Sequence, residues 1–274
     1  MNNRPDNQDD QNTVLEAKAL AAGYGERLVI PSLSLQIMMG KITALVGPNG
    51  SGKSTLLKAL ARIAPPRAGM VYLDGRSIAR MSTREVALHL AILPQGPTAP
   101  EELTVAELVE QGRYPHAGPL RMLREQDHVA IQEALAQTNM EQFRHRRLDS
   151  LSGGERQRAW IALALAQATP VLLLDEPTTF LDVGHQIEVL DLVQTLNRTH
   201  GKTIVLVVHD LNLAARYADR MVVLQNGRIV ADGTPREVLT ASLLADVFQV
   251  QAYILSHPVD GMPVCLPYGT VMAL

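Results

Sequence analysis

Apolar positions along the chain fall into short runs of strand length that alternate with longer stretches of helical spacing. The pattern predicts strands at 14–24, 33–37, 41–46, 70–73, 171–175, 203–208, 221–225 and 228–231. It predicts helices at 54–64, 125–137, 183–198 and 211–218. Strands that alternate with helices are typical of an α/β core whose strands are mostly parallel.

Turn and capping residues mark where several of these elements begin and end. Pro65 and Pro66 end the first helix, and Asn226-Gly227 predicts a tight hairpin. Three segments have the spacing of a capping box and are expected to open helices: Ser82 to Glu85, Thr104 to Glu107 and Thr234 to Glu237, the last with Pro235 at the first helical position.

The chain divides into four parts on this basis. Residues 1–12 are polar and are expected to form a disordered tail, and 13–250 form the main domain. Within it, a helical insertion over about 95–151 joins the following helix to make a helical subdomain of about 95–168. The last stretch, 251–274, is a C-terminal appendix whose structure the pattern does not predict.

Composition limits the class of protein. The 274 residues are 46% hydrophobic, which suits a sizeable core, and the net charge of −3 argues against a nucleic-acid partner. No apolar run approaches the ~18–20 residues that span a bilayer, and the N-terminus lacks a signal-peptide core. A cytoplasmic chain that docks on another protein at a membrane is therefore expected. The single cysteine, Cys265, is interpreted as a small buried residue.

The segment from Gly47 to Thr55 matches the phosphate-binding loop pattern G-x-x-x-x-G-K-[ST] between a strand and a helix. Glycines let the backbone wrap around phosphate oxygens, and the helix start adds positive potential. Lys53 supplies charge to the phosphates, and the Ser54 hydroxyl suits Mg²⁺. The expected nucleotide-binding residues of this segment are Gly47, Pro48, Asn49, Gly50, Ser51, Gly52, Lys53, Ser54 and Thr55.

Two further segments carry polar residues in suggestive places. The apolar run 171–174 is followed by Asp175 and Glu176. Solvated acidic residues after a buried strand are common. Near a phosphate-binding loop, however, Asp175 suits a Mg²⁺ ligand and Glu176 suits a general base. The segment Leu151-Ser-Gly-Gly-Glu-Arg-Gln-Arg158 could be an ordinary Ser N-cap or a second phosphate-binding helix start.

The ordered set of these segments resembles the ABC (ATP-binding cassette) ATPases over about residues 14–240. In that resemblance Tyr24 stacks on adenine, Gln95 is the Q-loop residue that contacts Mg²⁺ and the catalytic site, 179–182 is the D-loop and His209 the switch histidine. Taken singly, each of these could be an ordinary surface residue. Glu155 departs from the family's usual glutamine. The fold implied is a P-loop NTPase core with an antiparallel β edge and a helical insertion.

Two local segments narrow the resemblance to one group of importers within the ABC family. The stretch Gly112-Arg-Tyr-Pro-His116 and the stretch from Glu176 through His185 to Gln186 are similar to ATPases of importers for iron–siderophores, ferric citrate, haem and cobalamin. The C-terminal 256–267 is most similar to the ferric-siderophore members. Iron import is thus the first expectation, with a cobalamin or haem importer as the alternative.

The resemblance also implies partners and a place in the cell. Two copies are expected to sandwich ATP, with Ser152, Gly153 and Gly154 of one copy on the nucleotide held by Lys53 of the other. Gln95 and the helical insertion would contact a membrane permease at the cytoplasmic face of the cell membrane, and a periplasmic or extracellular substrate-binding protein would act indirectly. Arg113, Tyr114 and His116 are expected to form an exposed docking patch.

Other classes fit the sequence less well. A translation or DNA-repair ATPase of the same family would usually carry paired cassettes or a long coiled coil, which this sequence lacks. A non-catalytic regulator would be expected to lose Glu176 or His209, and both are present. A fused exporter would need membrane helices in the same chain.

Overall fold

A computed structural model describes residues 12–100, 102–117 and 123–271. The expected N-terminal tail falls almost wholly outside these ranges, as do Gly118 and Pro119 at the end of the turn-rich stretch. No helix in the described ranges combines the length and apolar character needed to cross a bilayer.

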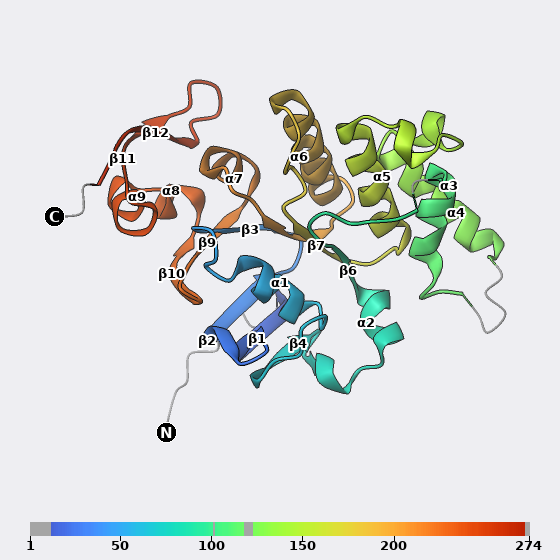
Figure 1. Cartoon of the computed structure of the whole chain (residues 1–274), viewed down its shortest axis with the longest axis horizontal. Helices are drawn as coiled ribbons and strands as arrows, with labels where there is room; N and C mark the ends of the chain where they lie inside the picture. Colours follow the sequence, from blue (N-terminus) through green and yellow to red (C-terminus); the bar gives the residue numbers. More distant parts are fainter. Residues whose placement is uncertain (1–11, 101, 118–122, 272–274) are drawn as a thin grey trace.

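A six-stranded sheet forms the centre of the molecule (Figure 1). Its strands are parallel except for the edge strand β10, which pairs antiparallel with β9 through the predicted Asn226-Gly227 turn. The order is β10 (Arg228–Gly233), β9 (Arg220–Gln225), β3 (Ile42–Val46), β8 (Thr203–Val207), β7 (Val171–Asp175) and β6 (Leu90–Leu93). Strand β6 was not predicted, because its four residues are too few to show a period.

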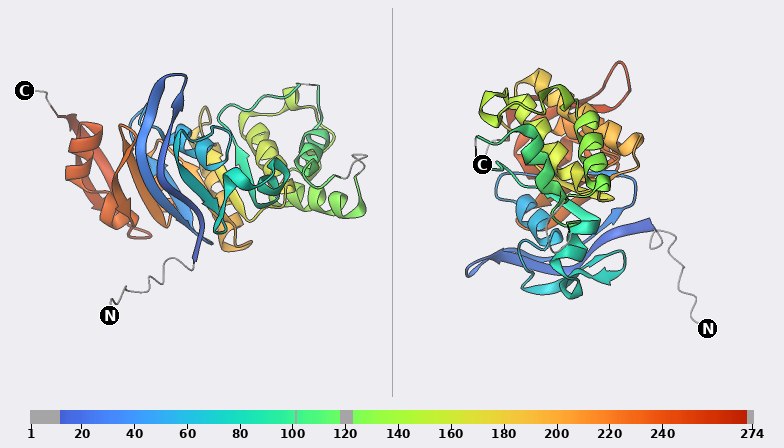
Figure 2. Two further views of the ribbon diagram at one scale, coloured as in Figure 1. Left: turned by 90° about the horizontal axis from the view of Figure 1, so that it is seen from below. Right: turned by 90° about the vertical axis from the view of Figure 1, so that its right-hand side faces the viewer.

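An antiparallel four-stranded sheet packs against one side of this core (Figure 2). Its order is β2 (Arg27–Met38), β1 (Thr13–Tyr24), β4 (Ala68–Leu73) and β5 (Arg76–Ser77). Helix α1 (Lys53–Leu60) lies between the two sheets and buries Leu56, Leu57 and Leu60 there. The expected antiparallel β edge is confirmed.

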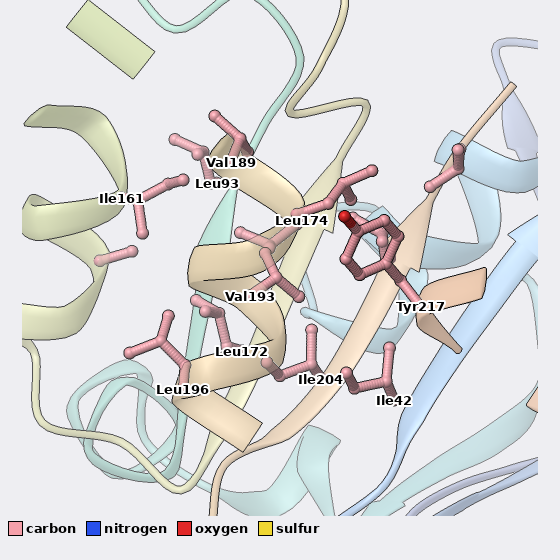
Figure 3. Close-up of a cluster of buried hydrophobic side chains, with 14 of the residues drawn as sticks. Ile42, Leu93, Ile161, Leu172, Leu174, Val189, Val193, Leu196, Ile204 and Tyr217 are labelled. Carbon is pink, nitrogen blue, oxygen red and sulfur yellow. The ribbon is translucent and has the colours of Figure 1, made fainter. Parts of the chain in front are cut away.

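The inner strands of the central sheet are buried on both faces. Residues of β7 alternate: Leu172 and Leu174 pack toward the helices α5 and α6, whereas Val171 and Leu173 pack toward α1 and the antiparallel sheet. Figure 3 shows the helix-side cluster, in which α6 (Val183–Arg198) lies over the sheet. This two-sided burial explains why these strands are continuous apolar runs.

Helices between β6 and β7 form the expected helical insertion, at the opposite end of the molecule from the C-terminus (Figures 1 and 2). Both predicted capping boxes near it are present, at Ser82 for α2 and at Thr104 for α3. The insertion contains α3 Val105–Glu110, η3 Gln111–Arg113, α4 Glu125–Gln137, η4 Glu141–Phe143, η5 Leu148–Ser150 and α5 Gly153–Ala166, whereas α2 (Thr83–His89) precedes β6.

The C-terminal part is more regular than its sequence pattern indicates. After α7 (Leu211–Tyr217), the capping box at Thr234 opens α8 (Pro235–Val238) as predicted, and α9 (Ala241–Phe248) follows. Strands β11 (Val250–Ser256) and β12 (Pro263–Thr270) then form a two-stranded hairpin. Cys265, a residue of β12, has a buried side chain, as interpreted from the sequence. The short 3-10 turn η2 (Ile78–Arg80) completes the described elements.

Helix α1 ends at Leu60, four residues before the predicted end at Ala64. Arg62 adopts the left-handed conformation with φ 59°, and the Ile63 amide donates to the Lys58 carbonyl over 2.8 Å. That bond closes the helix in a Schellman arrangement before Pro65 is reached, so the proline is not what stops it.

The expected exposure of Arg113 is wrong. Its side chain is buried, and Nε donates to Asp127 Oδ1 over 2.9 Å while Nη1 donates to the Ala166 carbonyl over 2.6 Å. His116 contacts the same region through Nε2 and the Gln167 carbonyl, 2.8 Å away. Tyr114 alone of the three has a largely exposed side chain, at 64%. Arg113 therefore ties η3 to α4 and to the end of α5 and does not face a partner.

Candidate active site

The phosphate-binding loop connects β3 to α1 at the carboxyl end of the central sheet. Gly47 has φ 143°, and a Cβ there would lie 2.1 Å from the Leu224 carbonyl oxygen of β9. The loop turns through a bond from the Ser51 amide to the Pro48 carbonyl, 3.2 Å, and the Gly227 amide donates to Ser51 over 2.9 Å. Glycine at position 47 is required because the loop passes this closely under a neighbouring strand.

Lys53 opens α1 and folds back over its own loop. Its Nζ donates to the Gly47 carbonyl over 2.8 Å and to the Pro48 carbonyl over 3.0 Å. Desolvation lowers the pKa of this buried ammonium, and the carboxylates of Glu176 and Asp175 partly offset that effect. The cation is thus held inside the loop, where phosphate oxygens would be stronger partners than carbonyl groups.

Asp175 ends β7 directly beside α1. The Ser54 hydroxyl donates to Asp175 Oδ1 over 2.9 Å, whereas the buried Oδ2 has no hydrogen-bond partner among the described residues. Burial raises the pKa of Asp175, the bond from Ser54 opposes this, and the nearby Glu176 raises it further. A hydroxyl beside a carboxylate oxygen without a partner suits a hard divalent cation such as Mg²⁺.

Glu176 follows Asp175 just beyond the end of β7 and points to different partners. Gln95 Nε2 donates to its Oε2 over 2.6 Å, the Thr179 hydroxyl donates to the same oxygen over 3.1 Å, and His209 Nε2 lies 2.5 Å from Oε1. Its backbone has a left-handed φ of 53°. Such conformations in non-glycine residues cluster at functional sites.

Four strands contribute to this cluster. Gln95 follows β6, Asp175 and Glu176 stand at and after the end of β7, His209 follows β8, and the loop of Lys53 follows β3. These strands are parallel, so their carboxyl ends share one edge of the sheet. Ligands in open α/β sheets bind at this edge.

A cleft of about 410 Å³ opens in front of Lys53. Tyr24, with 51% of its side chain exposed, stands in its wall together with Arg27 and Val29. The remaining lining residues are Asn49, Gly50, Gly52, Lys53, Ser54, Thr55, Glu176 and His209. Sequence reasoning missed Arg27 and Val29, although their position shortly after Tyr24 places them across the β1–β2 turn.

Ser152, Gly153 and Gly154 do not line this cleft. They open α5, which belongs to the helical insertion and stands apart from α1 (Figure 1). The Ser152 hydroxyl accepts from the Glu155 amide, and the Glu155 carboxylate accepts from the Ser152 amide over 2.8 Å. Glu155 therefore completes a capping box, a role that glutamate and glutamine can both fill.

Comparisons with known proteins agree with this geometry. The family model described as "ABC transporter" matches residues 30–179. The probable siderophore transport system ATP-binding protein YusV of Bacillus subtilis is 51% identical over 94% of this chain and 94% of its own length. The iron(3+)-hydroxamate import ATP-binding protein FhuC of the same organism is 49% identical, over 94% of this chain and 96% of its own.

Two solved structures are also similar. One is described as an inward-facing conformation of a putative metal-chelate type ABC transporter; it has a TM-score of 0.81 and 27% identity, over 94% of this chain and 98% of that one. The other is the dimeric structure of MJ0796, a bacterial ABC transporter cassette, with a TM-score of 0.71 and 30% identity, over 81% of this chain and 99% of that one.

Proposed function

This chain belongs to the ABC transporter family of ATP-binding proteins, and on that premise we propose that it hydrolyses ATP to drive uptake of an iron(III)–siderophore complex through a separate permease. The observation that carries the proposal is the cluster around Glu176, in which Gln95, Thr179 and His209 hold one carboxylate beside the phosphate-binding loop. The likeness to siderophore and iron-hydroxamate ATP-binding proteins supports the cargo.

Nucleotide binding begins in the cleft. The exposed ring of Tyr24 would stack on the adenine, and the phosphates would enter the loop 47–55. Lys53 would exchange its carbonyl partners Gly47 and Pro48 for phosphate oxygens, which form stronger charge-assisted bonds.

The residues suited to hold Mg²⁺ are Ser54, Asp175 and Gln95, with the buried Asp175 Oδ2 as the acceptor that otherwise has no partner among the described residues. When bound with ATP, Mg²⁺ neutralises charge on the phosphate oxygens.

Hydrolysis would use Glu176 as the base that orients a water molecule and accepts its proton. His209 and Gln95 fix the two carboxylate oxygens, so the orientation of the base depends on both. Thr179 contributes a third contact to the same carboxylate. The carboxylate is thus placed by residues that follow three different strands.

A second copy of the chain would complete the site. Ser152 and Gly154 are absent from the cleft of their own chain and lie at the start of a 14-residue helix, whose positive end suits a γ-phosphate held by another copy. The likeness to a cassette whose solved structure is dimeric supports a pair of copies. ATP would favour the closed pair, and hydrolysis would release it.

The remaining partners follow from the same proposal. The helical insertion and Gln95 would contact a permease at the cytoplasmic face of the membrane, and a substrate-binding protein outside would deliver the cargo to that permease. Tyr114, which directly follows η3 and is 64% exposed, is the proposed contact in the insertion. No nucleic-acid partner is proposed.

The test of cargo is uptake by cells that lack the gene for this chain. We expect labelled ferric siderophore uptake to fall to background and to return with the wild-type gene but not with a Glu176→Gln gene. Haem and cobalamin uptake, measured in parallel, serve as controls. Loss of cobalamin or haem uptake with intact siderophore uptake would overturn the siderophore assignment while leaving the ATPase assignment in place.

A further inference from the structure

The imidazole of His185 is held firmly at the start of α6. Asp182 caps this helix: Oδ1 accepts from the His185 amide over 2.9 Å, and Oδ2 accepts from the same residue's Nδ1 over 2.8 Å. The bond from the backbone amide, followed by that from the ring, lowers the pKa of Asp182 and keeps it ionised. One carboxylate thus bonds to both the backbone and the ring of His185, which favours this orientation of the ring.

That ring packs directly against Gly154 at the start of α5. A Cβ built on Gly154 would lie 2.3 Å from His185 Cδ2 and 2.8 Å from Cγ. The φ of Gly154 is outside the left-handed region, so an alanine could adopt its backbone conformation. Glycine is therefore required at this position for space, and the space is filled by a side chain of the same polypeptide.

Nearby glycines do not share this constraint. A Cβ on Gly153 would make only a 3.4 Å contact with Leu181, and one on Gly184 would meet Asp182 Oδ1 at 3.6 Å. Both distances are ordinary van der Waals contacts. Among these three glycines, only the one that faces His185 has no room for a methyl group.

His185 also connects two parts of the proposed mechanism, the base Glu176 and the helix start at Gly154. The segment 179–185 starts with the Thr179 hydroxyl on Glu176, 3.1 Å away, and ends with the His185 ring on Gly154. Helices α5 and α6 also contact each other. The start of α5 is thereby packed on segment 179–185, which follows the proposed base Glu176 in the same chain.

We propose that His185 is a positioning residue: its Asp182-anchored ring packs on Gly154 and sets where the Ser152–Gly154 helix start stands relative to Glu176. This rests on the proposed function, in which Ser152–Gly154 act on the nucleotide of a second copy. His185 itself need not touch ATP. Through His185, the position of Ser152–Gly154, which face the second copy, depends on the arrangement around Glu176 of the same chain.

The test is a double-mutant cycle on the full-length chain: Gly154→Ala, His185→Ala and the two combined. We expect Gly154→Ala to lower kcat of the ATPase about tenfold or more, because the added methyl displaces the start of α5. His185→Ala alone should lower kcat a few-fold, since the contact between the ring and Gly154 is lost. The combined variant should recover to the level of His185→Ala, because the clash is gone.

Three controls separate this role from a general loss of structure. Gly184→Ala, whose methyl has room one residue before the histidine, should match wild type. Gly154→Ala should lower the melting temperature, and the combined variant should recover it, because the clash is gone. The ATP affinity of each isolated subunit should stay near wild type, since none of the three residues lines the cleft. ATP-dependent dimerisation, followed in a Glu176→Gln background, should change in parallel with kcat.

The outcomes are distinguishable. If the combined variant stays as impaired as Gly154→Ala, the methyl group acts by disturbing the nucleotide bound to the second copy, not by clashing with His185. The inference is then overturned. An unimpaired Gly154→Ala overturns it as well. If the wild-type chain itself hydrolyses no ATP with its permease present, the proposed function fails instead, before the cycle is compared.

Discussion

The Gln95 amide donates to Glu176 Oε2 over 2.6 Å, which joins a residue just beyond β6 to one just beyond β7. The two residues are 81 positions apart in the chain. They meet because β6 and β7 are parallel neighbours whose carboxyl ends share one edge of the sheet. The candidate base is therefore held by the segment that leads into the helical insertion.

Replacing this base tests the core of the mechanism. Glu176→Gln should retain ATP binding and lower the hydrolysis rate by about 10²–10⁴-fold, because an amide cannot accept the proton from water. The variant should accumulate as an ATP-bound dimer, which size-exclusion chromatography with light scattering would detect. Near-normal turnover would remove Glu176 from its assigned role.

The phosphate-binding loop predicts two graded losses of affinity. Lys53→Ala should bind ATP far more weakly, because a charge-assisted contact to phosphate is lost. Tyr24→Ala should weaken binding by a smaller amount, about 0.5–1.5 kcal/mol for the stacking contact. Isothermal titration calorimetry measures both, and equal affinity of Lys53→Ala and wild type would contradict the assignment of the loop.

Because Arg113 is buried and Tyr114 is exposed, alanine substitutions at these two residues should have different effects. Arg113→Ala leaves the buried Asp127 without its charged partner and should cost about 3–5 kcal/mol of unfolding free energy. Tyr114→Ala removes an exposed ring and should leave the melting temperature unchanged. Denaturant unfolding and co-purification with the permease are the measurements.

The two variants should therefore fail differently. We expect Tyr114→Ala to be stable, to bind ATP and to associate weakly with the permease. If it still co-purifies with the permease and supports transport, the docking assignment at η3 is wrong. A marked loss of stability in Tyr114→Ala would show instead that the ring packs within the insertion.

Tyr217 provides a prediction on pH. Burial, together with its hydroxyl bond to Asp191 Oδ1 at 2.7 Å, raises its pKa from 10.0 to about 12. Because the folded pKa is the higher one, this residue contributes stability that is complete below pH 10.0 and is lost as the pH rises through about 12. Tyr217→Phe should be less stable than wild type by about 1 kcal/mol near neutral pH.

The check is denaturant unfolding at several alkaline pH values. The difference in unfolding free energy between wild type and Tyr217→Phe should shrink as the pH rises through the stated interval. A difference that stays constant would mean that the phenol does not titrate as inferred. Tyr24→Phe, at an exposed ring outside the core, is the matched control.

Local features of this protein were determined by the sequence alone. Capping boxes at Ser82 and Thr104 and the Asn226-Gly227 hairpin depend on interactions within a few residues, so their patterns predict them directly. The apolar runs also predicted the inner strands, because a strand covered on both faces must be apolar throughout.

Contacts between distant segments were decided only by the tertiary structure. The sequence marked Arg113 as an exposed cation, but whether a charge is buried depends on a partner such as Asp127 and on a free carbonyl at the end of α5, neither of which is local. Likewise, the packing of His185 on Gly154 joins the starts of two helices. Such pairings follow from how the sheet orders its strands and from the space left between helices, and neither has a period that a single sequence can show.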